Sequence, residues 1–226
     1  MLSEDINFKE FQWVQELDPQ RSILQGHAYL TAKRIMDLAL VIISMPLWLV
    51  VMGIVAGLIW FESPGAPVLF IQKRTGKGGK RFDMYKFRTM VPDAEELKPS
   101  YMHLNELQWP DFKITNDPRI TRVGWFLRKT SLDELPQVIN VLKGDMSLVG
   151  PRPTSFGTDT YSLWHTERLD VQPGLTGLWQ IIGRGETEFD DRLRLDIIYI
   201  EKRCFKLDLA IMIITVGTVL QRKGRL

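Results

Sequence analysis

The longest apolar segment of the chain lies near its amino-terminal end. Between Asp37 and Glu62, 24 consecutive residues carry no charge, which is long enough to insert into a membrane. Pro46 divides the segment into Ile35–Met45 and Leu47–Trp60. At about 1.5 Å per residue these halves reach roughly 16 and 21 Å. Each half is therefore expected to be too short for the hydrocarbon core of a bilayer, which is roughly 30 Å thick.

Basic residues flank this segment on both sides. Lys33 and Arg34 precede it, and five more follow it: Lys73, Arg74, Lys77, Lys80 and Arg81. Basic residues mark the cytoplasmic side of a membrane segment, so these charges do not favour a simple span. Because proline bends a helix, the pattern fits a helix that enters the membrane, breaks at Pro46 and returns to the same face. A tilted span and a buried helix of a soluble protein stay open as alternatives.

Short apolar or alternating runs follow the membrane segment. Pro67–Gln72 and Arg81–Phe87 flank the glycine- and lysine-rich turn Thr75–Lys80, and this pattern predicts a β-hairpin. The turn lacks the glycine, lysine and hydroxyl spacing of a phosphate-binding P-loop. Its positive charge suits contact with anionic lipid headgroups.

Four other segments have recognisable patterns. Phe8–Leu17 has a weak helical stripe, which fits a packing helix or a regulatory or dimer contact, and Pro92–Leu107 predicts a polar helix broken at Pro99. Residues 171–188 are rich in glycine and turn residues and predict a loop. Leu209–Leu220 is apolar but too short to span, so a core helix and an interfacial helix are both open.

Composition narrows the classes further. The 226 residues suffice for one domain plus a membrane element, and a net charge of +2 gives no support for nucleic-acid binding. Cys204 is the only cysteine, and the three histidines are scattered, so neither a disulfide framework nor a histidine metal cluster is expected. The first 30 residues are acidic and lack the apolar core of a signal peptide. The soluble part is therefore expected in the cytoplasm.

Two adjacent carboxylates, Asp133 and Glu134, follow a stretch rich in basic residues. Ser131 and Glu134 have the spacing of a capping box, in which both would cap a helix. If Pro136 instead begins the helix, the two acids lie just before its positive end. The local sequence therefore leaves two roles open for Asp133 and Glu134, a helix cap and a catalytic pair.

The nearby arginines would suit phosphate chemistry. A carboxylate can attack phosphorus to form an acyl-phosphate, but this reaction of two anions needs arginines and usually Mg²⁺ to neutralise charge. Arg128 lies five residues before Asp133, and Arg152 lies between Pro151 and Pro153. Rigid guanidinium groups suit phosphate oxygens, although structural ion pairing is an alternative for each arginine.

From about Ala32 to Val219 the chain resembles the small monotopic superfamily of bacterial polyprenyl-phosphate phosphoglycosyl transferases, which initiate capsule, exopolysaccharide and O-antigen assembly. The matching motifs are Lys33-Arg34 with Asp37, Pro46, Val68–Arg74, Lys86–Met90, Asp117–Arg122, Arg128–Pro153, Pro173–Gln180, Gly183-Arg184 and Asp196–Tyr199. Some relatives have serine before the proline where this chain has Met45. The bend is therefore expected to rest on proline and packing.

The resemblance implies a two-step reaction at the cytoplasmic face of the bacterial inner membrane. Asp133 would attack the β-phosphate of a UDP-sugar and release UMP, and undecaprenyl phosphate would then accept the phosphosugar. Mg²⁺ would bridge Asp133 and the phosphates, and Glu134 would complete the acidic pair. Arg128 and Arg152 would bind phosphate. Nucleotide-sugar contacts would come from Lys86, Arg88, Thr176, Gln180 and Arg184.

The implied fold is mixed α/β but mostly helical, with a re-entrant kinked helix, a small hairpin and interfacial helices. Residues 1–31 would be an amino-terminal extension, 32–62 the re-entrant helix, and 63–226 the cytoplasmic catalytic domain with an interfacial C-terminal helix. A homodimer and a neutral hexose, glucose or galactose, are expected. The rival readings are a membrane-anchored scaffold without turnover and a metal-dependent glycosyltransferase that uses Asp190 and Asp191. Those two acids more simply form a solvated face.

Overall fold

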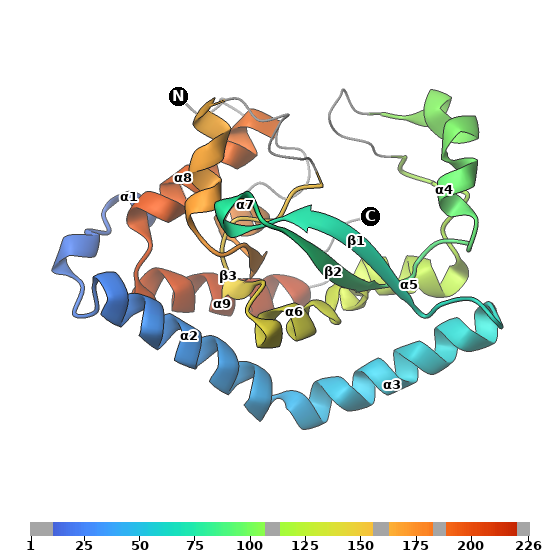
Figure 1. The fold of residues 1–226 in the computed structure, drawn as a ribbon, viewed down its shortest axis with the longest axis horizontal. Coiled ribbons are helices and arrows are strands. Elements are labelled where there is room, and N and C mark those ends of the chain that lie inside the picture. Colours follow the sequence, from blue (N-terminus) through green and yellow to red (C-terminus); the bar gives the residue numbers. More distant parts are fainter. Residues whose placement is uncertain (1–10, 107–113, 156–162, 183–188, 221–226) are drawn as a thin grey trace.

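The computed structural model describes residues 11–106, 114–155, 163–182 and 189–220 (Figure 1). This part of the chain is mostly helical, as predicted, and has two small sheets. The helices are α1 (Gln12–Gln15), α2 (Gly26–Ile43), α3 (Met45–Glu62), α4 (Ala94–Leu97), α5 (Arg122–Thr130), α6 (Gln137–Lys143), α7 (Leu178–Ile182), α8 (Phe189–Lys202) and α9 (Phe205–Leu220). The strands are β1 (Leu69–Thr75), β2 (Arg81–Phe87), β3 (Ser147–Val149) and β4 (Gly174–Thr176). Short 3₁₀ helices are η2 (Pro19–Arg21), η3 (Lys77–Gly79), η4 (Lys98–Leu104), η5 (Leu132–Glu134) and η7 (Leu163–Asp170).

Helices α2 and α3 form a V whose point faces away from the other elements (Figure 1). The break lies at Ser44, two residues before Pro46, which confirms the predicted interruption. Each arm has 18 residues and is about 27 Å long. By length and composition α3 could cross a membrane. The prediction that both halves are too short is therefore wrong for α3, because the helix extends two residues beyond Leu47–Trp60 at each end.

Two side chains bond main-chain oxygens at the break. The hydroxyl of Ser44 donates to the oxygen of Leu40 at 2.7 Å, and the indole Nε1 of Trp48 donates to the oxygen of Val41 at 2.9 Å. Such serine back-bonding bends a helix. The expectation that the bend rests only on proline and packing is therefore wrong, since Ser44 supplies a serine back-bond one residue before Met45.

Both arms of the V are attached to the same globular part. Asp37 of α2 is buried and accepts a hydrogen bond from the hydroxyl of Ser147 at 2.7 Å. At the far end of α3, the carboxylate of Glu62 accepts from the backbone N–H of Val123 at 3.1 Å. The apolar side of α3 also packs on the hairpin and on α5. The two outer ends of the V are thus fixed to one body.

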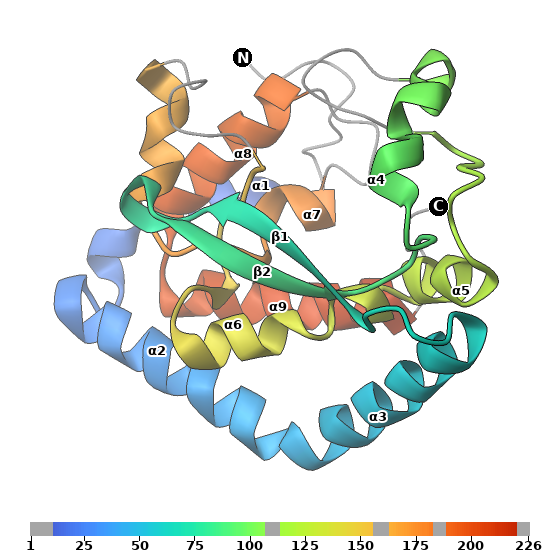
Figure 2. The ribbon, with the colours of Figure 1, turned by 45° about the vertical axis from the view of Figure 1, so that its right-hand side comes forward.

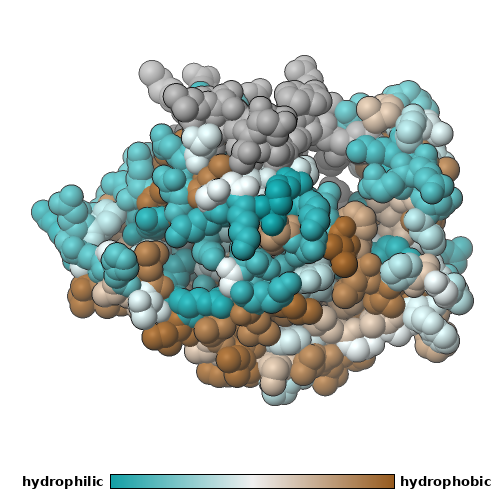
Figure 3. Space-filling view, in the orientation of Figure 1, coloured by the Kyte–Doolittle hydropathy of each residue, from teal (hydrophilic) through white to brown (hydrophobic). Residues whose placement is uncertain are grey.

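The outward side of the V is apolar and exposed. Figure 3 shows hydrophobic residues gathered along the lower edge of this face, where Figure 1 places α2 and α3. The exposed large side chains of the two helices include Ile35, Ile43, Leu47, Val50, Ile54 and Phe61. A surface of this size marks an interaction site and not an ordinary solvent face.

The predicted hairpin is confirmed. Strands β1 and β2 pair antiparallel from Leu69 opposite Phe87 to Thr75 opposite Arg81, and η3 forms the turn. Figure 2 shows the hairpin lying across α6. The buried amide of Asn140 fixes this contact, because its oxygen accepts from the N–H of Tyr85 at 3.1 Å.

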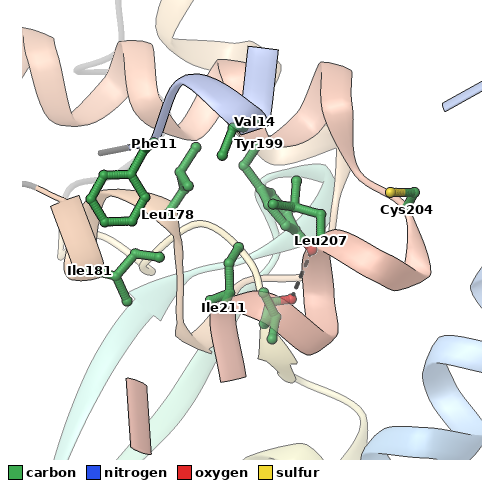
Figure 4. Close-up of a cluster of buried hydrophobic side chains, with 9 residues drawn as sticks. Phe11, Val14, Leu178, Ile181, Tyr199, Cys204, Leu207 and Ile211 are labelled. Atoms are coloured by element: carbon green, nitrogen blue, oxygen red, sulfur yellow. Dashed lines mark hydrogen bonds between the residues drawn. The ribbon is translucent and has the colours of Figure 1, made fainter. Parts of the chain in front are cut away.

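The carboxyl-terminal half forms a second core (Figure 4). Side chains from α1, α7, α8 and α9 meet there, and the hydroxyl of Tyr199 donates to the oxygen of Val149 at 3.3 Å. The loop predicted for residues 171–188 is wrong for its described part, which holds β4 and the buried helix α7. Helix α9 packs in this core through the buried Ile211, while Val216 is exposed. The alternative of an interfacial helix stays a prediction.

Two other segments agree with the sequence. In the predicted polar helix the α-helical part, α4, ends at Leu97, and the 3₁₀ helix η4 with Pro99 follows, as the predicted break requires. Helix α1 packs through the fully buried Val14, as expected for a packing helix.

Candidate active site

The two adjacent carboxylates lie on a tight connection between two helices. Helix α5 ends at Ser131, whose φ of 57° is left-handed, and η5 then carries Asp133 and Glu134. The hydroxyl of Ser131 makes no capping hydrogen bond, so the predicted capping box is wrong. Pro136 is the residue from which α6 begins, which confirms the alternative register. After this left-handed turn the pair lies against the end of the hairpin, where Glu134 contacts Lys86 of β2.

Glu134 is held by two cations. Its carboxylate accepts from the Lys86 ammonium at 3.0 Å and from Arg152, with Nη1 3.2 Å from Oε2. Burial alone would raise the pKa of Glu134, but Arg152 and Lys86 outweigh it and hold that pKa well below its usual range. Glu134 is thus a permanent anion whose oxygens are occupied by ion pairs.

Asp133 has the opposite environment. Burial and the neighbouring charge of Glu134 raise its pKa, against the lowering influence of Lys86, Arg128 and Arg152. Within the described residues its carboxylate makes no hydrogen bond or ion pair. Two adjacent acids therefore differ sharply, since one is locked in ion pairs and the other has free, more basic oxygens. Environments that push neighbouring pKa values apart are typical of catalytic carboxylates.

Arg128 faces the same place from α5. Its Nε donates to the hydroxyl of Thr89 at 2.9 Å, and burial lowers its pKa while Asp133 acts to raise it. The contact depends on a close approach at Gly124. A Cβ built there would lie 2.0 Å from the main-chain oxygen of Thr89. The bare glycine thus lets α5 sit against the segment that orients the guanidinium.

A second buried ion pair supports the loop that carries Arg152. The Nη2 of Arg168 donates to the main-chain oxygen of Arg152 at 2.6 Å and to the carboxylate of Asp196 at 2.7 Å. Burial raises the pKa of Asp196 to about 7, in spite of Arg168. The contacts run from α8 through Arg168 to Arg152 and from there to Glu134.

The other predicted site residues lie apart from the carboxylates or outside the described residues. Thr176 bonds the hydroxyl of Thr215 on α9 at 2.7 Å, and Gln180 donates to the oxygen of Leu175 at 3.1 Å. Arg88 is buried, and burial lowers its pKa. No described contact joins these three side chains to Asp133 or Glu134. Arg184 lies outside the described residues. Lys86, in contrast, belongs to the carboxylate cluster itself.

A magnesium ion fits this site in a limited way. The described residues contain no group of three or more acids, histidines or cysteines that could hold a metal ion. Magnesium is, however, commonly held by one or two carboxylates together with substrate phosphates and water. The unoccupied oxygens of Asp133 suit that mode, whereas those of Glu134 are taken by Lys86 and Arg152.

The sequence had singled out two further acids, Asp190 and Asp191. Asp191 is buried at the start of α8 and pairs with Arg194 at 3.2 Å. The interpretation of a solvated face is therefore wrong for Asp191, which serves the packing of α8.

Sequence reasoning missed the supporting role of Arg168 and Asp196. A signal for Asp196 was available, because Leu193, Asp196 and Tyr199 recur at helical spacing and all three are buried. An acid within a buried stripe needs a partner. Arg168 lies in the 3₁₀ helix η7 and has no comparable signal.

Sequence comparison finds known proteins that are similar to this chain. The pattern of a family described as "Bacterial sugar transferase" matches residues 28–222. The "Galactosyl transferase CpsE" of Streptococcus agalactiae is 43% identical over 202 residues, which cover 88% of this chain and 44% of that protein. The "Undecaprenyl-phosphate galactose phosphotransferase" of Salmonella typhimurium is 44% identical over 173 residues, 74% of this chain and 36% of that protein.

A shorter relative is covered almost fully. The "Exopolysaccharide production protein ExoY" of Rhizobium meliloti is 37% identical over 205 residues, 85% of this chain and 87% of that protein. The chain spans less than half the length of the two longer relatives. The family match covers both arms of the V, the hairpin and the carboxylate pair, so the chain belongs to the bacterial sugar transferase family.

Proposed function

We propose that the protein transfers a sugar 1-phosphate from a UDP-sugar to undecaprenyl phosphate, with Asp133 as the nucleophile. The observation that carries this proposal is the division of labour between two adjacent acids. Glu134 is ion-paired with Lys86 and Arg152, whereas Asp133 has free oxygens and a raised pKa. A more basic carboxylate is the better nucleophile, and the surrounding cations suit an anionic phosphate.

In the first step a carboxylate oxygen of Asp133 attacks the β-phosphorus of the UDP-sugar. A bond forms between this oxygen and phosphorus, and the bond from phosphorus to the oxygen that bridges the α- and β-phosphates breaks. UMP leaves with the bridging oxygen and its electron pair. The phosphosugar stays on Asp133 as an acyl-phosphate.

In the second step a phosphate oxygen of undecaprenyl phosphate attacks the same phosphorus. The acyl-phosphate bond breaks, the carboxylate of Asp133 is regenerated, and undecaprenyl-diphosphate sugar is released. Arg128 and Arg152 would stabilise the charge that collects on the phosphoryl oxygens in both steps. When bound at Asp133, Mg²⁺ would neutralise part of the phosphate charge. Glu134 would hold Lys86 and Arg152 in place and would not exchange protons, because its pKa is low.

The V of α2 and α3 would carry the protein in the membrane. The exposed apolar side of both helices, and the attachment of both outer ends to one globular body, support a re-entrant path that leaves the domain on a single face. Since UDP-sugars are cytosolic, this face would be the cytoplasmic one. The reaction would begin the assembly of a surface polysaccharide, in line with the names of the relatives in Salmonella typhimurium and Rhizobium meliloti.

Release of UMP tests this proposal. Purified protein with undecaprenyl phosphate and Mg²⁺ is expected to release UMP from one member of a panel of UDP-sugars, with galactose and glucose before their N-acetylated forms. Release of UDP would instead indicate a glycosyltransferase that moves the sugar alone. No nucleotide release from the whole panel would favour a membrane-anchored scaffold.

A further inference from the structure

A cavity of about 250 Å³ lies beside the turn of the hairpin, and none of the residues that line it belongs to the carboxylate cluster. Helix α2, the turn of the hairpin, the segment before β4 and the end of α8 form its walls. Arg81 begins β2 next to the turn, whereas Lys86, which pairs with Glu134, lies near the other end of this strand. At about 3.3 Å per residue these two positions are about 17 Å apart. The cavity is thus a place that the proposed reaction does not use.

The walls carry an excess of positive charge. Four cations line the cavity against two carboxylates: Lys33, Arg34, Lys77 and Arg203 against Asp37 and Asp170. Arg203 is half-buried, and within the described residues it makes no hydrogen bond or ion pair. Lys77 is exposed on the hairpin turn. Both cations are therefore available to a ligand.

One buried cation also has unused donors. Lys33 is only 8% exposed, and its ammonium pairs with the Asp208 carboxylate at 3.0 Å, which leaves its other N–H donors without a hydrogen-bond partner within the described residues. An ammonium has three N–H donors, and leaving them unsatisfied in a buried place costs free energy. An oxygen-rich anion in the cavity would satisfy them.

The rim of the cavity is apolar on one side. Leu30 lines the cavity and is itself 44% exposed. The exposed apolar surface of the V begins further along the same helix. A ligand that joins a phosphate to a hydrocarbon chain would place the phosphate between Arg203 and Lys77 and the chain along α2.

We propose that this cavity binds the phosphodiester headgroup of a membrane phospholipid. The volume corresponds to about eight water-sized groups, which suits a glycerol phosphate. The inference rests on the proposed membrane placement of the V but not on catalysis. Its occupant is distinct from the lipid phosphate that reacts at Asp133, because no residue that lines the cavity makes a described contact with Asp133 or Glu134. The bound headgroup would fix the depth of α2 relative to the bilayer surface.

Native mass spectrometry of the purified full chain tests this site. The Asp133→Asn variant serves as the background, so that turnover plays no part. Dioleoylphosphatidylglycerol is titrated, and one tightly retained lipid per chain is expected. The change Lys77→Gln with Arg203→Gln is expected to weaken its retention about tenfold or more. The matched control is Lys80→Gln with Lys206→Gln, which removes two exposed cations three residues further along and is expected to retain the lipid.

Equal retention in the two double variants would overturn the proposal. Displacement of the lipid by an equal concentration of sn-glycerol 3-phosphate would also overturn it, because the site would then belong to a soluble phosphate. If the double variant melts at a lower temperature, lipid retention is measured for Lys77→Gln alone. This change is expected to weaken retention about threefold. Unchanged retention would count against the site. Failure of the proposed reaction is recognised separately, by the absence of UMP release from the unaltered protein.

Discussion

The indole Nε1 of Trp48 donates a hydrogen bond to the main-chain oxygen of Val41 at 2.9 Å, across the break between α2 and α3. The donor belongs to the second helix and the acceptor to the first, so the bond holds the two arms at their angle. It supplies a donor to an oxygen at the end of α2, and the Ser44 hydroxyl adds a second bond to the Leu40 oxygen, which already accepts from the Ser44 backbone N–H.

The bend is therefore expected to survive the loss of the proline alone. Pro46→Ala restores one backbone donor but leaves the bonds of Ser44 and Trp48 in place. Addition of Ser44→Ala and Trp48→Phe removes both, and the helix is then expected to straighten and turn the amino terminus outward in part of the molecules. Cysteines placed at exposed positions near Tyr29 and near Ser63, in a Cys204→Ser background, are treated with an impermeant maleimide. Labelling from the periplasm in the unaltered chain would contradict the re-entrant path.

Asp133→Asn is expected to reduce UMP release at least about a thousandfold, because an amide keeps the shape but cannot form the acyl-phosphate. Mass spectrometry of the unaltered protein after treatment with UDP-sugar should detect a hexose-phosphate on the peptide that contains Asp133. Glu134→Gln is the matched change at the adjacent acid and should leave that adduct detectable. An active Asp133→Asn variant would exclude this nucleophile.

Arg128 is expected to act on phosphate through the geometry that Thr89 gives it. Arg128→Lys keeps the charge but loses the planar fork, so activity should fall about a hundredfold with little change in melting temperature. Thr89→Val removes the hydroxyl that accepts from Nε and should cost about tenfold, whereas Thr89→Ser should retain most activity. A drop in melting temperature that matches the loss of activity would make Arg128 a structural residue instead.

Lys86 is expected to set the pH range of the reaction. Asp133 must be ionised to attack, and Lys86 is one of the charges that lower its pKa. Lys86→Met should therefore raise that pKa further, and activity should be lost at a higher pH as the solution is acidified. The rate of UMP release is measured as a function of pH for the unaltered protein and for Lys86→Met. The displacement of the acidic side of the profile gives the change in the pKa of Asp133. An unmoved profile would show that Lys86 acts only through Glu134.

Arg168 and Asp196 are expected to position Arg152. Either Arg168→Gln or Asp196→Asn leaves a buried charge unpaired, so both stability and activity should fall. The double change removes both charges and should recover melting temperature but not the rate, which should stay about tenfold low because the Arg152 oxygen has lost its charged donor. Normal activity in the double variant would contradict the positioning role.

The pH dependence of stability offers a check on the same pair. Because the folded pKa of Asp196 is raised to about 7, its contribution to stability is complete below the unfolded pKa near 3.8 and is lost as the pH rises through 7. Asp196→Asn should flatten this part of the melting-temperature profile. An unchanged slope would mean that Asp196 is ionised in the folded protein at lower pH.

The local sequence predicted well the elements that depend on interactions between residues close together in the chain. The hairpin followed from alternation around a glycine turn, and Gly78 and Gly79 have the positive φ values that such a turn needs. The adjacency of Asp133 to Glu134 and of Arg128 to both was visible in the sequence. Their division of roles was not, since it depends on Lys86, which lies 48 residues before Glu134.

The failures have a common physical cause, which is contact between distant segments. The glycines of 171–188 suggested a loop, yet a Cβ built at Gly174 would lie 2.1 Å from the backbone nitrogen of Gly150. These glycines therefore allow β3 and β4 to approach each other, and no local pattern reveals that. Likewise, α2 begins at Gly26, well before the apolar run. Its charged side chains contact α6, β3 and α9, which lie far away in the sequence.

The attachment of α2 to α9 also orders events during synthesis. The hydroxyl of Tyr29 donates to Asp208 at 2.8 Å, and Lys33 pairs with the same carboxylate, although 179 residues separate Tyr29 from Asp208. Both arms of the V leave the ribosome long before Asp208 is made. A chain cut short before α9 would retain the whole carboxylate pair, yet Lys33 would lose its ion-pair partner and Tyr29 its acceptor. The charged end of α2 would then have no contact with Asp208 until α9 is made.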